Sequence, residues 1–188
     1  MENERDVLKR FQDRTPYLRP LIDEIKEPSD PPTIVLEYLE DHLLNASIKK
    51  TLNRKELRYV SRRILEALKV LHEDGYVHTG KRFCSKPSCS FTKSKVKDVK
   101  LDNVLVNYRE GDIRFSDVQL GDLGGACPAD SEYAKGGTSI GAPMWTSPEV
   151  IMETPWNTAT DIWSFGTVVR PNYHLTTKLK SADLLCSS

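Results

Sequence analysis

The sequence lacks a long apolar run, an excess of either charge and a secretory leader, and each absence excludes a class of protein. No stretch of the 188 residues approaches the ~18 consecutive apolar residues of a transmembrane helix, and the charged start MENERDVLKR is unlike a secretory signal. The 27 Lys and Arg balance 27 Asp and Glu, whereas proteins that bind nucleic acid through bulk charge are basic. We therefore expect an intracellular protein, cytoplasmic, nuclear or both, with neither a membrane nor a nucleic acid as its partner.

Cysteine is scarce as well. The four cysteines are scattered or lie in polar company, so a disulfide framework is not expected. A zinc site formed by His78, Cys84 and Cys89 is disfavoured, because this spacing matches no common zinc finger and no fourth ligand is evident. The length of the chain fits one domain.

The neutral total hides one segment of uneven charge. Residues 80–97 contain five Lys and one Arg but no acidic residue, and the rest of the chain has 21 basic against 27 acidic residues. The segment therefore differs from its surroundings. One hypothesis is that it is translated from an unspliced intron, because the codons of Gly80 and Lys81 can spell a splice-donor sequence.

Residue patterns predict the elements of the first half of the chain. Residues 1–14 have the periodicity of a short amphipathic helix. The β-branched and aromatic runs at 18–25 and 33–39 predict two strands, joined as a hairpin by the proline-rich EPSDPP. The clearest element is a helix that follows a capping box at Asn53 and ends near Gly75.

The second half is predicted to contain strands, a long loop and a helix. Short strands at 104–106 and 113–115 flank a turn, and residues 121–148, rich in Gly and Pro, form a long loop. A last helix is expected over about residues 160–168. Its aromatic residues are expected in the core: Trp163 and Phe165.

Four short strings, in this order, resemble the catalytic half of a eukaryotic-type protein kinase. They are His78 with Asp98-Val-Lys-Leu-Asp-Asn103, Asp122-Leu-Gly124, Ser147-Pro-Glu149 and Asp161-Ile-Trp-Ser-Phe-Gly166. That family has a His-Arg-Asp loop followed by four residues and Asn, then Asp-Phe-Gly and Ala-Pro-Glu. Each string alone is a weak signal, but the ordered set is a strong one.

The resemblance implies a role for each matching residue. Asp98 would be the catalytic base, Lys100 the cation that contacts the phosphate, and Asn103 and Asp122 the ligands of Mg²⁺. Asn and Asp supply the hard oxygen donors that Mg²⁺ prefers. A Lys two residues after the catalytic Asp is the pattern of Ser/Thr kinases, so ATP and Ser/Thr-containing protein substrates are the implied partners.

The resemblance continues upstream of these strings. Leu36-Glu37-Tyr38-Leu39 is similar to the gatekeeper and hinge, where backbone groups bind adenine, so Glu37 and Leu39 are the implied nucleotide contacts. Glu4 fits the helix glutamate that pairs with the ATP-site lysine. It fits equally well an ordinary acidic residue favoured by the helix dipole.

Several of these residues have a second interpretation. Asp98 and Asp102 can be solvated loop carboxylates and Lys100 a surface charge, which is the usual state of charged residues. Asp117 competes with Asp122 for the metal role, but Leu-Gly after Asp122 completes the motif. His78 can be a packed structural histidine, and the family uses that position structurally.

The sequence also departs from the family pattern. No glycine-rich loop or Val-Ala-Ile-Lys strand precedes Glu4, and residues 80–97 separate His78 and Thr79 from Asp98. An insertion there either misplaces the catalytic groups, at a cost of ~10²-fold in rate per ~1 Å, or loops out and leaves them in place. Trp145 stands where the family has Tyr, and the likeness ends at Val169.

We therefore predict an α+β, protein-kinase-like fold. It consists of a partial small lobe, made of a helix, a β-hairpin and the hinge, and an incomplete, mainly helical large lobe. The partial domain spans residues 1–169, with the basic insertion 80–97, and residues 170–188 form a divergent tail. The predicted function is Mg-ATP-dependent phosphoryl transfer to Ser/Thr, impaired in this chain. The alternatives are a pseudokinase-like interaction module or an inactive fragment from imperfect splicing or gene modelling, and the oligomeric state is left open.

Overall fold

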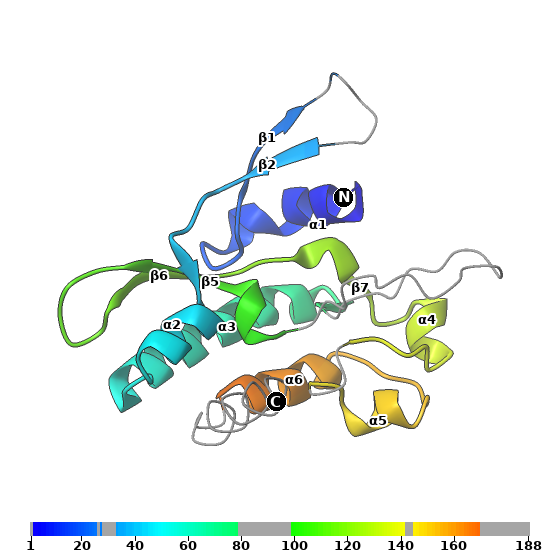
Figure 1. The fold of residues 1–188 in the computed structure, drawn as a ribbon. Coiled ribbons are helices and arrows are strands. Elements are labelled where there is room, and N and C mark those ends of the chain that lie inside the picture. The colour runs from blue at the N-terminus through cyan, green and yellow to red at the C-terminus, as the bar shows by residue number, and fades with distance from the viewer. Residues whose placement is uncertain (1, 26, 28–32, 79–98, 142–144, 170–188) are drawn as a thin grey trace, which may run out of the picture.

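The computed structural model of the chain describes residues 2–25, 27, 33–78, 99–141 and 145–169. Several predicted features lie outside these residues: the catalytic residue Asp98, the basic insertion, the whole tail 170–188 and both cysteines weighed for a zinc site. In Figure 1 the N-terminal elements lie at one end of the molecule and the C-terminal helices at the other.

The N-terminal part consists of one helix and one β-hairpin. Helix α1 (Glu2–Phe11) buries its apolar residues, and a single 3₁₀ turn, η1 (Gln12–Arg14), follows it. Strands β1 (Leu21–Ile25) and β2 (Thr33–Leu36) pair antiparallel and lie above α1 in Figure 1. The predicted helix and hairpin are confirmed, although β2 ends at Leu36 and not at residue 39.

Helix α3 (Arg54–Glu73) is the longest element and the centre of the core. The predicted capping box is present: the Asn53 side chain accepts hydrogen bonds from the amides of Lys55 and Glu56, and the Glu56 carboxylate accepts one from the Asn53 amide. An N-cap of this kind contributes about 1 kcal/mol. The helix ends at Glu73, and the predicted stop residue Gly75 follows the C-cap Asp74 with a left-handed φ of 69°. One face is buried: Val60, Ile64, Ala67, Leu68 and Leu71.

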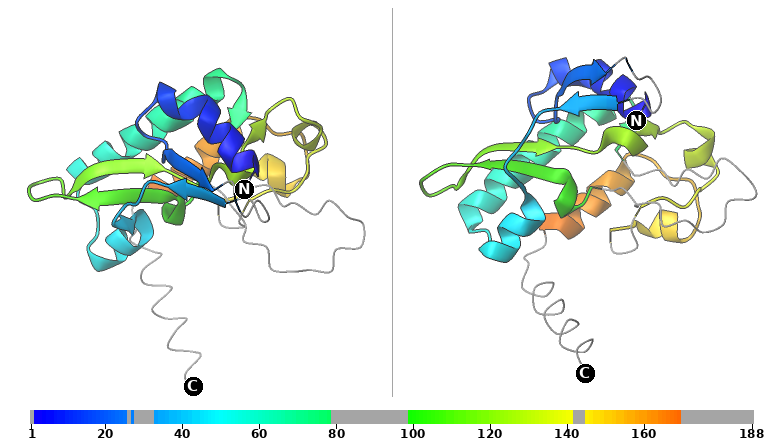
Figure 2. Two further views of the ribbon diagram at one scale, coloured as in Figure 1. Left: turned by 90° about the horizontal axis from the view of Figure 1, so that it is seen from above. Right: turned by 45° about the horizontal axis from the view of Figure 1, so that its top comes forward.

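A three-stranded antiparallel sheet packs on α3. Its strand order is β3 (Asp41–His42), β5 (Val104–Tyr108) and β6 (Phe115–Leu120). The β5–β6 hairpin confirms the strand predicted at 104–106 and the turn after it, but the second strand begins at Phe115, where the predicted one ends. Figure 2 shows the hairpin lying along α3. The Tyr59 hydroxyl of α3 donates a 2.8 Å hydrogen bond to the carbonyl of Ser116 in β6, so helix and sheet are joined by a polar contact as well as by packing.

A buried carboxylate joins this sheet to helix α2 (Leu43–Lys49). Asp41 of β3 accepts hydrogen bonds from Lys49 Nζ at 2.8 Å and from the Tyr108 hydroxyl at 2.9 Å. The Lys49 ammonium holds the pKa of the Asp41 carboxyl well below its usual range. Burial, together with the Asp41 charge, raises the pKa of Tyr108 to about 12.

Several short elements were not predicted. One of them is helix α2. Others lie in the segment expected as one long loop, which contains η3 (Leu123–Gly125), β7 (Cys127–Pro128) and α4 (Glu132–Lys135). Strand β7 pairs with β4 (Tyr76–Val77), directly after α3. The expectation of a continuous loop was therefore wrong, because pairing with a distant strand orders part of it.

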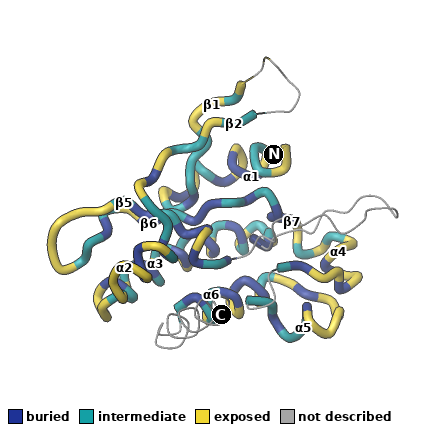
Figure 3. The backbone as a smooth tube through the Cα atoms, viewed as in Figure 1, coloured by how far each residue is buried: buried dark blue, intermediate teal, exposed yellow. Residues whose placement is uncertain are grey.

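The C-terminal part contains α5 (Pro148–Ile151) and α6 (Ala159–Val169), which confirms the last predicted helix. Val168 of α6 belongs to the hydrophobic core and Asp161 of the same helix is a buried polar residue; Figure 3 shows buried backbone along this helix. Phe165 packs against the core as expected, but Trp163 is 48% exposed. The expectation for Trp163 was wrong because no described element covers the outer face of α6. No helix among the described residues is both long and apolar enough to cross a membrane.

A cluster of charges and rings holds α1 against the end of α3. Arg14 and Arg10 donate hydrogen bonds of 2.7 and 2.9 Å to Asp74, and Arg14 and Arg10 hold the pKa of that carboxyl below its usual range. Phe11 and Tyr76 pack edge to face, with their ring centroids 5.1 Å apart. The N-terminal helix is thus fixed to the larger part of the molecule.

Candidate active site

The β5–β6 hairpin brings Asn103 and the Gly121-Asp122 pair to the same end of the sheet. Asn103 is the last residue of η2 (Leu101–Asn103) and directly precedes β5, and Gly121 directly follows β6. Because the register pairs Val104 with Leu120, the two ends must meet. The Gly121 amide donates a 2.8 Å hydrogen bond to the Asn103 carbonyl.

Asp122 has an unusual backbone conformation. Its φ of 60° and ψ of 55° are left-handed, which is uncommon for a residue other than Gly and occurs often at functional sites. The next residue, Leu123, is fully buried, so the chain on the C-terminal side of Asp122 is anchored in the core. Asn103 is also buried, with 7% of its surface exposed.

Lys100 belongs to the same turn as Asn103. Its carbonyl accepts a 3.0 Å hydrogen bond from the Asn103 amide, and its Nζ lies 3.1 Å from Asp102 Oδ2. Val99, one residue earlier, is buried. The two predicted site residues Lys100 and Asn103 are therefore held by one short, well-anchored segment, which begins directly after the predicted base Asp98.

Asp117, the competing candidate for the metal role, lies elsewhere. It is an exposed residue of β6, opposite Asn107 in β5. Its carboxylate accepts hydrogen bonds from the Ser116 hydroxyl at 2.8 Å and from Asn107 Nδ2 at 3.3 Å. The structure thus brings Asp122, and not Asp117, next to Asn103.

A buried polar network of His72, His78 and Asp161 packs against this end of the hairpin. Asp161 of α6 is fully buried, and its Oδ2 atom accepts a 2.8 Å hydrogen bond from the His78 amide and lies 2.8 Å from His72 Nε2. His78 is also fully buried, and its Nε2 lies 3.0 Å from the Gly121 carbonyl. His78 is therefore placed as a packed histidine that links α6 to the residue before Asp122. Sequence reasoning missed His72 and Gly121, which belong to no motif string.

Glu37, a predicted nucleotide contact, already uses its polar groups within the chain. Its amide donates to the Pro20 carbonyl at 3.1 Å, and its carbonyl accepts a 2.7 Å hydrogen bond from Arg19 Nε. Its carboxylate accepts one from Gln119 Nε2 at 3.0 Å. Leu39, the second implied nucleotide contact, is buried. Arg19 carries no recognisable sequence signal, so its contact with the hinge could not be predicted.

Helix α1 touches the segment that follows Asp122. The Nδ2 atom of the Asn3 side chain donates hydrogen bonds to the carbonyls of Gly124 and Ala126, at 3.1 and 2.9 Å. Glu4, the residue with two open interpretations, lies beside Asn3 in the first turn of α1. Asn3, which sequence reasoning did not single out, therefore joins this helix to the predicted metal motif.

The residues at the hairpin end fit a magnesium ion. Asn103 and Asp122 offer an amide and a carboxylate oxygen, the donors that Mg²⁺ prefers, and Mg²⁺ commonly takes only one or two protein ligands beside water and phosphate. Among the described residues there is no group of three or more His, Cys, Asp or Glu side chains that could hold a metal. A two-ligand site of this kind does not require one.

Comparisons with known proteins relate the chain to protein kinases. The profile of the family described as protein kinase domain matches residues 95–179, a range that contains Lys100, Asn103 and Asp122. Serine/threonine-protein kinase max-2 of Caenorhabditis elegans is 28% identical over 189 aligned residues, which cover 97% of this chain and 25% of max-2. Serine/threonine-protein kinase PAK 5 of Rattus norvegicus is 30% identical over 137 residues, which cover 72% of this chain and 16% of PAK 5.

A fungal protein gives a similar result. Serine/threonine-protein kinase shk1/pak1 of Schizosaccharomyces pombe is 28% identical over 134 residues, which cover 71% of this chain and 17% of that protein. The chain spans about a quarter or less of the length of each of these three relatives. The likeness is therefore to one part of each relative.

Proposed function

Because this chain contains part of a eukaryotic-type Ser/Thr protein kinase domain, with an α+β fold, we propose that it transfers the γ-phosphoryl group of ATP to Ser or Thr hydroxyls of protein substrates. One observation carries the proposal. Asn103 and Asp122 lie at the same end of the β5–β6 hairpin, joined by the bond from Gly121 to Asn103, and Lys100 is held in the same turn.

Each residue has a part in the proposed transfer. Asn103 and Asp122 would hold Mg²⁺, which neutralises charge on the phosphates when it is bound. Lys100 would contact the phosphoryl group that is transferred. To do so, Lys100 must leave Asp102, which costs little because exposed ion pairs contribute only ~0–1 kcal/mol. Asp98 would accept the proton of the attacking hydroxyl, while ADP leaves with the electron pair of the broken P–O bond.

We also propose that this chain carries out the reaction slowly. The Glu37 amide already donates to the Pro20 carbonyl, so a nucleotide acceptor that uses this amide must first break that bond. The Glu37 carbonyl already accepts from Arg19 Nε, which leaves one lone pair for a nucleotide donor beside a positive charge. The 80–97 insertion also lies directly before the proposed base. The same occupied hinge favours a second candidate function, a pseudokinase-like module that binds protein partners and not ATP.

A phosphotransfer assay separates these possibilities. The full chain is incubated with radiolabelled ATP, Mg²⁺ and casein. We expect slow transfer that stops on addition of EDTA and in Asp98→Asn, while Asp102→Asn, the matched change in the same loop, keeps most of the rate. Melting curves with and without Mg-ATP are recorded in parallel.

Two results would contradict the proposal in different ways. Absence of transfer, together with a melting temperature that Mg-ATP does not change, would favour the interaction module. Fast transfer that disappears in Asp98→Asn would support the kinase function but contradict the proposed impairment.

A further inference from the structure

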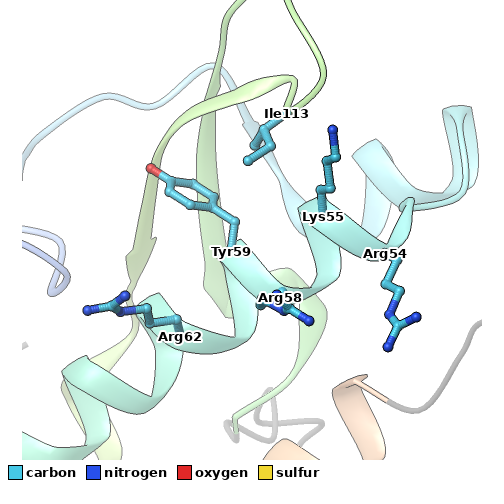
Figure 4. Close-up of a pocket in the computed structure, with 6 residues that line it drawn as sticks. All are labelled: Arg54, Lys55, Arg58, Tyr59, Arg62 and Ile113. Atoms are coloured by element: carbon cyan, nitrogen blue, oxygen red, sulfur yellow. The ribbon is translucent and has the colours of Figure 1, made fainter.

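The outer face of α3 carries a row of cations, which we call the basic stripe: Arg54, Lys55, Arg58, Arg62 and Lys69. The four-residue spacing from Arg54 to Arg62 places these three arginines along one line of the helix. Figure 4 shows their side chains extending from α3. This face is the opposite of the one that α3 buries against the core.

The stripe borders a continuous furrow. One hollow of about 710 Å³ is lined by the first four members of the stripe together with Tyr59 and Ile113, the latter from the turn between β5 and β6. A second hollow of about 410 Å³ shares Arg58 and Arg62 with the first and extends along α3 past the half-exposed Leu65. The furrow therefore combines cations with apolar walls.

The aromatic wall of the furrow is held in place by its neighbours. The Tyr59 hydroxyl donates to the Ser116 carbonyl at 2.8 Å. The guanidinium groups of Arg63 and Arg109 lie 4.9 and 5.8 Å from the centroid of the Tyr59 ring. A ligand would meet a preformed wall, so little conformational entropy is lost there on binding.

Two cations of the stripe have no anionic partner among the residues that the structure describes: Arg54 and Arg58. The others form exposed ion pairs, Lys55 with Asp112, Arg62 with Glu66 and Lys69 with Glu73. Such exposed pairs are weak and exchange easily. The stripe can therefore accept anions from a ligand with little loss of internal contacts.

The charge of the rest of the molecule decides which anion suits the stripe. The described residues include 24 acidic and only 17 basic ones, so the stripe is a local reversal on an acidic background. An extended polyanion, such as a nucleic acid or a lipid surface, would also face that background and be repelled. A short segment that contacts only the furrow avoids this repulsion, and the apolar walls favour a peptide.

We propose that the basic stripe binds a short acidic segment of a partner protein. Asp or Glu carboxylates of this segment pair with Arg54 and Arg58, and one apolar side chain fills the hollow beside Tyr59 and Ile113. The basic insertion of the chain itself has the wrong charge for this role. The proposal does not depend on the proposed kinase activity, because it concerns binding on a different face of the domain.

The probe for the test is a fluorescein-labelled ten-residue peptide of Glu and Asp with one central Leu, titrated with the full chain in the absence of ATP. Anisotropy is expected to show binding at 50 mM NaCl that weakens at 300 mM, as exposed ion pairs require. The double variant Arg54→Glu/Arg58→Glu should raise Kd at least about 10-fold, because attraction becomes repulsion at two sites. Changing the peptide Leu to Gln should raise it about 3-fold.

The control is Lys135→Glu, which makes the same change of charge as each single substitution of the double variant, at an exposed residue of α4. Its Kd should stay within 2-fold of the parent value, and each variant should melt at the temperature of the parent chain. Equal weakening by Lys135→Glu would overturn the proposal, since binding would then follow net charge. Tighter, stripe-dependent binding of an oligonucleotide duplex or of phosphatidylserine vesicles would overturn it as well.

Discussion

Asp122→Asn is expected to lower the rate of phosphoryl transfer by about 100-fold or more. The change keeps the size of the side chain and removes its negative charge, and removal of one preorganised electrostatic contact in an active site costs ~10²–10³ in rate. The hydrogen bond that closes this end of the hairpin joins the backbones of Gly121 and Asn103. The Asp122 side chain takes no part in that bond, so the hairpin should form unchanged. The measurement is the initial rate with radiolabelled ATP, Mg²⁺ and casein.

Asp117→Asn is the matched control for this prediction. Asp117 lies in the same strand and hairpin but is exposed and opposite Asn107. Its replacement should change the rate less than 2-fold. If Asp117→Asn abolished transfer and Asp122→Asn did not, the assignment of the metal role to Asp122 would be wrong.

The second large effect is expected on stability. Asp161→Ala should lower the free energy of unfolding by about 2–4 kcal/mol, because the His78 amide and His72 both lose their acceptor in a buried environment and an unsatisfied buried donor costs ~1–3 kcal/mol. Urea unfolding followed by circular dichroism measures the change. Asp161→Asn keeps one acceptor oxygen and should be less harmful.

An exposed carboxylate supplies the comparison for Asp161. Asp130 is exposed, and its replacement by Ala should change the free energy of unfolding by no more than about 0.5 kcal/mol. An effect of Asp161→Ala as small as this would show that the network of His72, His78 and Asp161 does not support the fold.

Elements with strong local signals could be predicted from the sequence. The capping box and the periodic apolar residues indicate helix α3. The branched residues and the prolines between them indicate the β1–β2 hairpin. Helix α2 could not be predicted, because distant residues hold it: Arg114 donates hydrogen bonds to the carbonyls of Ala46 and Lys50. Arg114 also forms a 3.1 Å ion pair with the buried Glu56, a contact that no local pattern indicates.

The candidate site likewise contains features that could be predicted from the sequence and features that could not. The motif strings imply, through the family resemblance, that Asn103 and Asp122 lie close together, because both match ligands of Mg²⁺. The contacts of Asn3 with Gly124 and of Arg19 with Glu37 could not be anticipated, since each joins a side chain to the backbone of a distant segment. Such contacts depend on how the elements pack and leave no periodic trace in the sequence.

The central claim is that Asn103 and Asp122 form one magnesium site at the end of the β5–β6 hairpin. The most direct test is a double-mutant cycle on the Kd of Mg-ATP, measured by calorimetry for the parent chain, Asn103→Ala, Asp122→Asn and the double variant. We predict that the double variant loses less affinity than the sum of the single losses, with a coupling of about 1 kcal/mol or more. Losses that add to within ~0.3–0.5 kcal/mol, or a larger coupling in a parallel cycle of Asn103→Ala with Asp117→Asn, would contradict this claim.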